Sequence, residues 1–264
     1  DTGDPSRCTS SQQTVLPSGV FTYEVQLFDD NGQFTGEKAS AQIQVDDQAP
    51  QFTAFGVDAS LTSSTIVELS FTVQDNPSNC VGLGEVELFN NDFGGESLGV
   101  IDLDETLCVQ TITQDFSSPS GDGTFTVCGK VRDRLGLEST SLTCATFSVD
   151  QTIPDVEGSV LKDSLGQKLL FVGPNFIPVE LEVNISDNNL VFSSVKAELS
   201  ALGKPGDISA TSCVDRGGNL STCRWQFTTL IQDTVSPTIT VKGEDVAGNL
   251  FSEDVSLGVI TKDG

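Results

Sequence analysis

The sequence predicts an all-β protein made of antiparallel β-sandwich domains in tandem. Apolar and polar residues alternate in segments such as VELSFTVQDNPSN (67–79) and VELEVNISDNN (179–189), and each segment breaks at an Asp-Asn pair. A period of two is typical of strands with one buried face. No segment has the spacing of an amphipathic helix. A third observation, an internal repeat, sets the number of domains.

A strand–turn–strand unit occurs three times. It reads FTYEVQLFDDNGQFTGEKASAQIQVDDQAP at 21–50, FTVCGKVRDRLGLESTSLTCATFSVDQTIP at 125–154, and ITVKGEDVAGNLFSEDVSLGVITKDG at 239–264. Each unit contains a D-x-x-G turn, with Asp29 and Gly32, Asp133 and Gly136, and Asp245 and Gly248. The spacing is close to the roughly 100 residues of one sandwich domain. Self-similarity at such a period indicates repeated domains.

The repeats divide the chain into two complete domains, residues 49–150 and 151–264, preceded by part of another. Residues 1–48 supply only the last two strands of that first domain, which we expect at Val20–Phe28 and Lys38–Val45. An isolated hairpin is marginally stable in water. Its partner strands therefore belong either to the same polypeptide or to another chain. The sequence has no initiating Met and no signal peptide, and we interpret it as a segment of a longer protein.

Charge and composition argue against several classes of function. The net charge is −25, from 38 acidic and 13 basic residues, which opposes binding to nucleic acid or anionic lipid. It suits a solvated surface, a high-salt environment or the binding of divalent cations. The absence of histidine removes serine- and cysteine-protease triads and His-ligated metals. Paired-carboxylate glycosidases remain, but the chain has only one Trp and one Tyr. We expect no enzyme, no nucleic-acid partner and no insertion into a membrane.

The seven cysteines predict disulfides. None forms a C-x-x-C pair, and wide spacing favours disulfides formed in an oxidising compartment. Cys128 and Cys144 are symmetric about Gly136, and both are expected on the outward face of a hairpin. Cys213 and Cys223 are symmetric about Gly218, and Cys80 and Cys108 pair by elimination, which leaves Cys8 alone. The alternative is free buried thiols.

The turn in DVAGN (245–249) and the V-D-x-x-x-P junction (149–154) resemble those of bacterial and archaeal Ig-like repeats in cell-surface proteins. The resemblance extends over essentially the whole chain. It implies tandem immunoglobulin-like sandwiches in an extracellular or cell-surface rod, stalk, surface layer or filament. The partners it implies are other domains of the same surface protein or neighbouring subunits. The alternatives are an adhesin or carbohydrate-binding region, or accessory domains of a secreted hydrolase.

Acidic residues recur in loops that an Ig-like sandwich brings to one end. The candidate metal ligands are Asp46, Asp47, Asp75 and Asp133 for the first complete domain, and Asp150, Asp187 and Asp245 for the second. Calcium takes six to eight hard oxygen ligands at about 2.3–2.6 Å, so Ca²⁺ is the candidate cofactor. The alternative is ordinary turn capping, in which Asp accepts hydrogen bonds from nearby backbone N–H groups.

Three further residues are candidates for surface functions. Asn184 and Asn219 begin N-x-S sequons and are candidate glycosylation sites, with Asn184 expected to face outward and Asn219 to lie in a hairpin turn. Trp225 either packs in the core or stacks on a sugar, and we favour the core.

Overall fold

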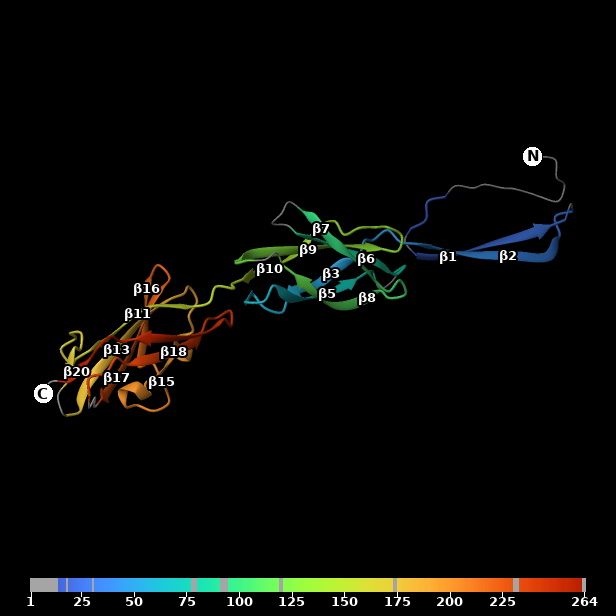
Figure 1. The fold of residues 1–264 in the computed structure, drawn as a ribbon. Helices are drawn as coiled ribbons and strands as arrows, with labels where there is room; N and C mark the ends of the chain where they lie inside the picture. Colours follow the sequence, from blue (N-terminus) through green and yellow to red (C-terminus); the bar gives the residue numbers. More distant parts are fainter. Residues whose placement is uncertain are drawn as a thin grey trace. The chain divides into compact units, whose positions relative to one another are not determined.

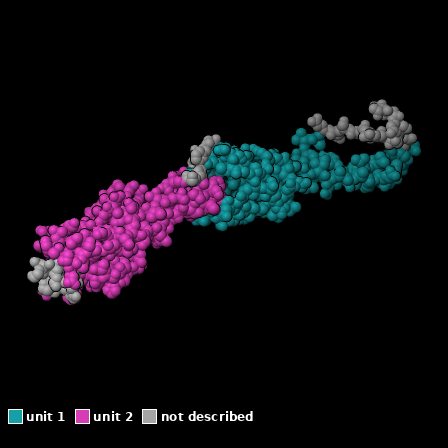
Figure 2. Space-filling model, in the orientation of Figure 1, with its two compact units in different colours: residues 1–58, 68–115, 125–146 teal, residues 59–67, 116–124, 147–264 magenta. Residues whose placement is uncertain are grey.

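A computed structural model describes residues 14–17, 19–29, 31–76, 80–90, 95–118, 121–172, 175–229 and 233–262. These residues form strands β1 to β20 and short 3₁₀ helices, with no α-helix among them (Figure 1). The prediction of an all-β fold is confirmed. Contacts divide the chain into two compact units (Figure 2): unit 1 is residues 1–58, 68–115 and 125–146, and unit 2 is residues 59–67, 116–124 and 147–264.

Strands β1 (Gly19–Phe28) and β2 (Phe34–Val45) form an antiparallel two-stranded sheet of their own. The first predicted strand agrees with β1, whereas β2 begins at Phe34 instead of Lys38. Nearly every side chain of the hairpin is exposed, and Val20, Val25 and Phe28 have exposed fractions of 60%, 62% and 58%. Within the described residues, no third strand joins this sheet.

The next strands form a three-stranded and a five-stranded sheet. The first has the order β3 (Gln51–Val57), β5 (Ile66–Gln74), β8 (Val109–Ser117), and the second β4 (Leu61–Thr62), β10 (Thr143–Val149), β9 (Gly123–Asp133), β6 (Leu83–Asn90), β7 (Glu96–Asp102). A Cβ placed on Gly129 of β9 would lie 2.7 Å from the Phe55 ring and 2.8 Å from the Phe52 ring, both on β3. The three-stranded sheet therefore packs with β3 against β9 of the five-stranded sheet.

A second pair of sheets lies in unit 2. One has the order β11 (Asp155–Lys162), β13 (Ile177–Ser186), β17 (Leu220–Thr229), β16 (Ser212–Gly217). The other has β15 (Asp207–Ser209), β14 (Lys196–Glu198), β18 (Thr238–Glu244), β19 (Leu250–Ser256), and β12 (Phe171–Val172) pairs separately with β20 (Thr261–Lys262). Leu181 and Trp225 of the first sheet and Ala197 and Val241 of the second belong to one buried cluster. Trp225 is 1% exposed, and its Nε1–H donates to the Ile208 carbonyl at 2.8 Å, so it is a core residue.

The two pairs of sheets share one arrangement. In each, the first long strand pairs with the second, as β3 does with β5 and β11 with β13. In the opposite sheet, β6 lies beside β9 as β14 lies beside β18. The predicted domain boundaries fall in the strand-free segments between β2 and β3 and between β10 and β11. The boundaries themselves stay a prediction.

The stretch VFSSVKAELSAL (191–202) alternates apolar and polar residues, which predicts a strand, but most of it is not extended. The chain forms the 3₁₀ helices Phe192–Ser194 and Ser200–Leu202, and only β14 between them is extended. Side chains compete here for the backbone: Ser194 Oγ donates to the Val191 carbonyl at 2.7 Å, and the Glu198 carboxylate accepts the Ser200 N–H at 3.1 Å. Such local bonds favour turns over strand pairing.

Three disulfides join Cys80 to Cys108, Cys128 to Cys144 and Cys213 to Cys223. These are the pairs expected from the sequence, and Cys8 lies outside the described residues. One expectation differs, because Cys128 is fully buried while Cys144 is exposed. Disulfides of this number indicate that the chain folds in an oxidising compartment.

Candidate metal centre

The D-x-x-G turn has the same geometry at each repeat, and it also occurs at 163–167. In every case the Asp N–H bonds to the carbonyl of the fifth residue, and the Gly N–H bonds to the Asp carbonyl. The Asp Oδ1 also accepts the N–H of the fifth residue, at 2.8–2.9 Å. The glycines have φ between +74° and +90°, a left-handed conformation that favours glycine. The predicted turn capping therefore occurs, but the backbone N–H groups of these turns bond only to the Oδ1 atom of each aspartate.

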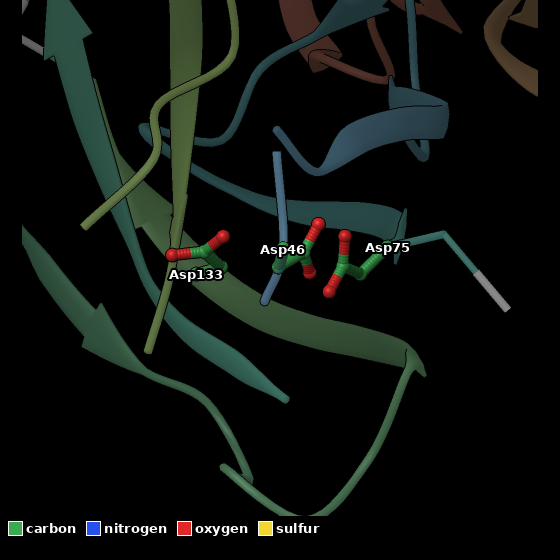
Figure 3. A group of neighbouring side chains, drawn as sticks. All are labelled: Asp46, Asp75 and Asp133. Carbon is green, nitrogen blue, oxygen red and sulfur yellow. The ribbon is translucent and has the colours of Figure 1, made fainter. Parts of the chain in front are cut away.

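Three of the candidate aspartates converge in unit 1. Asp46 lies in the segment between β2 and β3, Asp75 follows β5 directly, and Asp133 is the last residue of β9. One carboxylate oxygen of each lies within 4.8 Å of the others (Figure 3). Because two strand ends and a linker meet at this point, residues far apart in sequence supply neighbouring charges.

Each of these carboxylates has one satisfied and one unsatisfied oxygen. The Oδ1 atoms accept backbone N–H groups: Asp46 from Gln48 at 3.0 Å, Asp75 from Asn76 at 2.7 Å, and Asp133 from Leu137 at 2.9 Å. The three Oδ2 atoms are buried and have no hydrogen-bond partner. Asp75 and Asp133 are only 1% and 2% exposed. A buried, unpaired polar atom is unfavourable and calls for a ligand.

The charges around the cluster also favour a bound cation. Burial raises the pKa of the Asp75 carboxyl, and the negative charges of Asp46 and Asp133 raise this pKa further, against the lowering effects of the Asn76 and Val81 N–H groups. In the described part of the chain, no ion pair involves any of the three aspartates. The cluster therefore concentrates negative charge with no cationic side chain bonded to it.

The donor set fits a hard divalent cation. Two oxygens on opposite sides of a Ca²⁺ ion are separated by about 4.6–5.2 Å, twice the usual metal–oxygen distance, and the separation found here is 4.8 Å or less. Carboxylates without His or Cys suit Ca²⁺ or Mg²⁺ better than zinc. Three protein ligands leave positions for carbonyl oxygens or water.

The remaining predicted ligands lie elsewhere. Asp47 is exposed, and it is Asp46 that turns into the cluster. In unit 2, Asp187 and Asp245 are 8% and 2% exposed, and Asp150 is half-buried. Burial raises the pKa of Asp187, as do the charges of Asp245 and Asp150. Within the described residues, only the three aspartates of unit 1 have carboxylate oxygens that all lie within 4.8 Å of one another, so Asp150, Asp187 and Asp245 are farther apart.

A disulfide lies beside the unit 1 cluster. The sequence did not indicate that these two features are neighbours. The Asp75 N–H donates to the Cys108 carbonyl at 2.8 Å, and Gln44 Nε2 donates to the Cys80 carbonyl at 2.6 Å. The Cys80–Cys108 disulfide thus joins the loop beyond Asp75 to the segment that accepts its N–H. Spacing predicted the bond, but only the structure places it beside the carboxylates.

The two sequons differ in accessibility. Asn219 is exposed in the turn between β16 and β17, where it and Gly218 have positive φ, as expected. Asn184 is half-buried, and its Oδ1 accepts a hydrogen bond from Thr222 Oγ1 at 2.9 Å. The Asn219 side chain is therefore the more accessible of the two to a glycosylating enzyme.

No protein-family model matches the sequence, and no curated protein is significantly similar to it. Among the described residues, no helix has the length and apolar character needed to cross a bilayer.

Proposed function

We propose that this chain is a non-enzymatic, extracellular structural module of tandem immunoglobulin-like domains, stabilised by a Ca²⁺ ion held by Asp46, Asp75 and Asp133. The observation that carries the proposal is the convergence of three buried carboxylates, each with one oxygen within 4.8 Å of the others and each with a buried Oδ2 atom that has no hydrogen-bond partner. The ion would compensate three like charges and satisfy these atoms together. It would also hold the segment that leaves the hairpin against two strand ends of the sandwich.

The strand order supports the immunoglobulin-like part of the proposal. In unit 2, the order β11-β13-β17-β16 corresponds to A-B-E-D of an immunoglobulin domain, and β19-β18-β14-β15 corresponds to G-F-C-C′. The disulfides and the strongly acidic composition suit a protein exposed outside the cell. The burial of Trp225 in the core removes the main candidate for sugar stacking.

Calcium is expected to raise the melting temperature of the wild-type chain above its value in chelator. A ligand that binds only the folded state stabilises it by about 2.7 kcal/mol at a concentration of 100 times its Kd. Differential scanning calorimetry with added Ca²⁺ or with chelator measures the shift, and isothermal titration measures the stoichiometry, expected to be one ion per chain.

The matched variants separate metal binding from turn capping. Asp133→Asn keeps the Oδ1 that caps the turn but replaces the unsatisfied Oδ2 with an NH₂ group, and we expect it to lose the calcium-dependent shift. Asp163→Asn makes the same change in an equivalent turn outside the cluster, and it should retain the wild-type shift. Equal melting of the wild type in Ca²⁺ and in chelator would refute the proposal and leave turn capping as the role of these aspartates.

A further inference from the structure

We infer that two amide side chains, Asn189 and Asn249, take the place of the cation in the corresponding acidic cluster of unit 2. That sandwich is then stable without metal, and the residue at the fifth position of the D-x-x-G turn determines which cluster needs an ion. The inference rests on the function proposed for unit 1. The positions that determine whether a cluster needs a metal ion are Leu137 in unit 1 and Asn249 in unit 2.

The two clusters correspond residue by residue. Asp46 and Asp150 each precede the first strand of their sandwich, and each Oδ1 accepts the N–H two residues ahead. Asp75 and Asp187 directly follow β5 and β13. Asp133 and Asp245 begin equivalent turns, with Oδ1 bonded to the N–H of the fifth residue. The difference between the two clusters lies in the hydrogen-bond donors to the Oδ2 atoms.

In unit 2 two of those oxygens, Asp245 Oδ2 and Asp150 Oδ2, accept amide protons. Asn249 Nδ2 donates to Asp245 Oδ2 at 2.8 Å and to the backbone carbonyls of Asp150 at 2.8 Å and Thr152 at 3.3 Å. Asn189 Nδ2 donates to Asp150 Oδ2 at 3.1 Å. The first amide thus ties the segment before β11 to the turn after β18. A cation at the unit 1 cluster would link the equivalent parts in the same way.

Unit 1 lacks both donors. The residue equivalent to Asn249 is Leu137, whose side chain has no polar atom, and the sequence places Pro77 where unit 2 has Asn189. Proline has no N–H on either its backbone or its side chain. The Oδ2 atoms that correspond to those bonded in unit 2 are the ones without partners in unit 1. An amide carries no charge, so it can donate a hydrogen bond to a carboxylate oxygen but does not compensate the repulsion between the carboxylates. A cation does both.

The decisive experiment gives unit 1 the amide of unit 2. In the full chain, Leu137→Asn is expected to lower the calcium affinity about tenfold, the loss typical when the surroundings of a metal site are altered. It should also raise the melting temperature in chelator above that of the wild type. Leu135→Asn is the matched control, because Leu135 lies in the same turn and is 57% exposed. Calorimetry and calcium titration are the measurements.

The reciprocal change tests unit 2 and does not depend on Leu137→Asn folding. Asn249→Leu is expected to lower the melting temperature in chelator, whereas the same change at the exposed Asn188 should not. If Leu137→Asn matches Leu135→Asn, or Asn249→Leu matches Asn188→Leu, while the wild type still responds to Ca²⁺, the inference alone is overturned. A wild type that does not respond to Ca²⁺ overturns both the inference and the proposed function.

Discussion

Replacing Cys80 and Cys108 together with serine is expected to lower the free energy of unfolding by about 3–4 kcal/mol, the chain-entropy value for a loop of this length. The disulfide joins residues 28 positions apart, against 16 and 10 for the other two bonds, so it constrains the unfolded chain most. Denaturant unfolding of wild type and variant measures the loss. Replacing Cys213 and Cys223 with serine is the control, and it should lower the free energy of unfolding by less.

The same variant should also bind calcium more weakly. The Asp75 N–H is bonded to the Cys108 carbonyl, so loosening this loop loosens one ligand of the proposed ion. The control at Cys213 and Cys223 lies in unit 2 and should leave the calcium affinity unchanged. If both double variants lost affinity equally, the disulfide next to the cluster would have no particular role in metal binding.

Trp225→Ala is expected to destabilise the chain by about 3–5 kcal/mol, the usual cost of truncating a fully buried aromatic residue. The side chain is 1% exposed, and its removal also leaves the Ile208 carbonyl without the indole donor. Trp225→Phe keeps most of the apolar contact and should lose about 1–3 kcal/mol, mainly from that unpaired carbonyl. Chemical denaturation followed by circular dichroism measures both, since the chain has a single Trp and fluorescence would be lost.

The calcium response provides the second readout for Trp225→Ala. Because Trp225 lies in unit 2 and the three aspartates lie in unit 1, the affinity for Ca²⁺ should stay at the wild-type value. A stability loss below about 1 kcal/mol would contradict the core assignment.

The fold was predictable in most of the segments where side chains alternate in a regular way. The period of two located β5 and β13, and the glycine of the D-x-x-G turn located the hairpins, because its positive φ restricts the choice of residue. The stretch 191–202 also alternates, yet it forms turns in which Ser194 Oγ donates to the Val191 carbonyl and the Glu198 carboxylate accepts the Ser200 N–H. Alternation alone does not reveal such competition.

The candidate site was predictable in part. Asp75 and Asp133 stand at strand ends, so the strand pattern fixes where they lie. Asp46 and Asp47 lie in a linker without pairing, where no alternation decides which side chain points inward. The difference between the two clusters depends on Leu137 and Asn249, and sequence reasoning treated both turns as equivalent.

The order of the disulfides has a consequence for how the chain matures. Leaving Cys8 aside, each cysteine is bonded to the next one along the chain. A polypeptide that enters an oxidising compartment from its N-terminus can therefore form each native bond as soon as the second cysteine arrives. Among the three bonds that the structure describes, none has to wait for a later domain, so synthesis and translocation bring each pair of cysteines together in order.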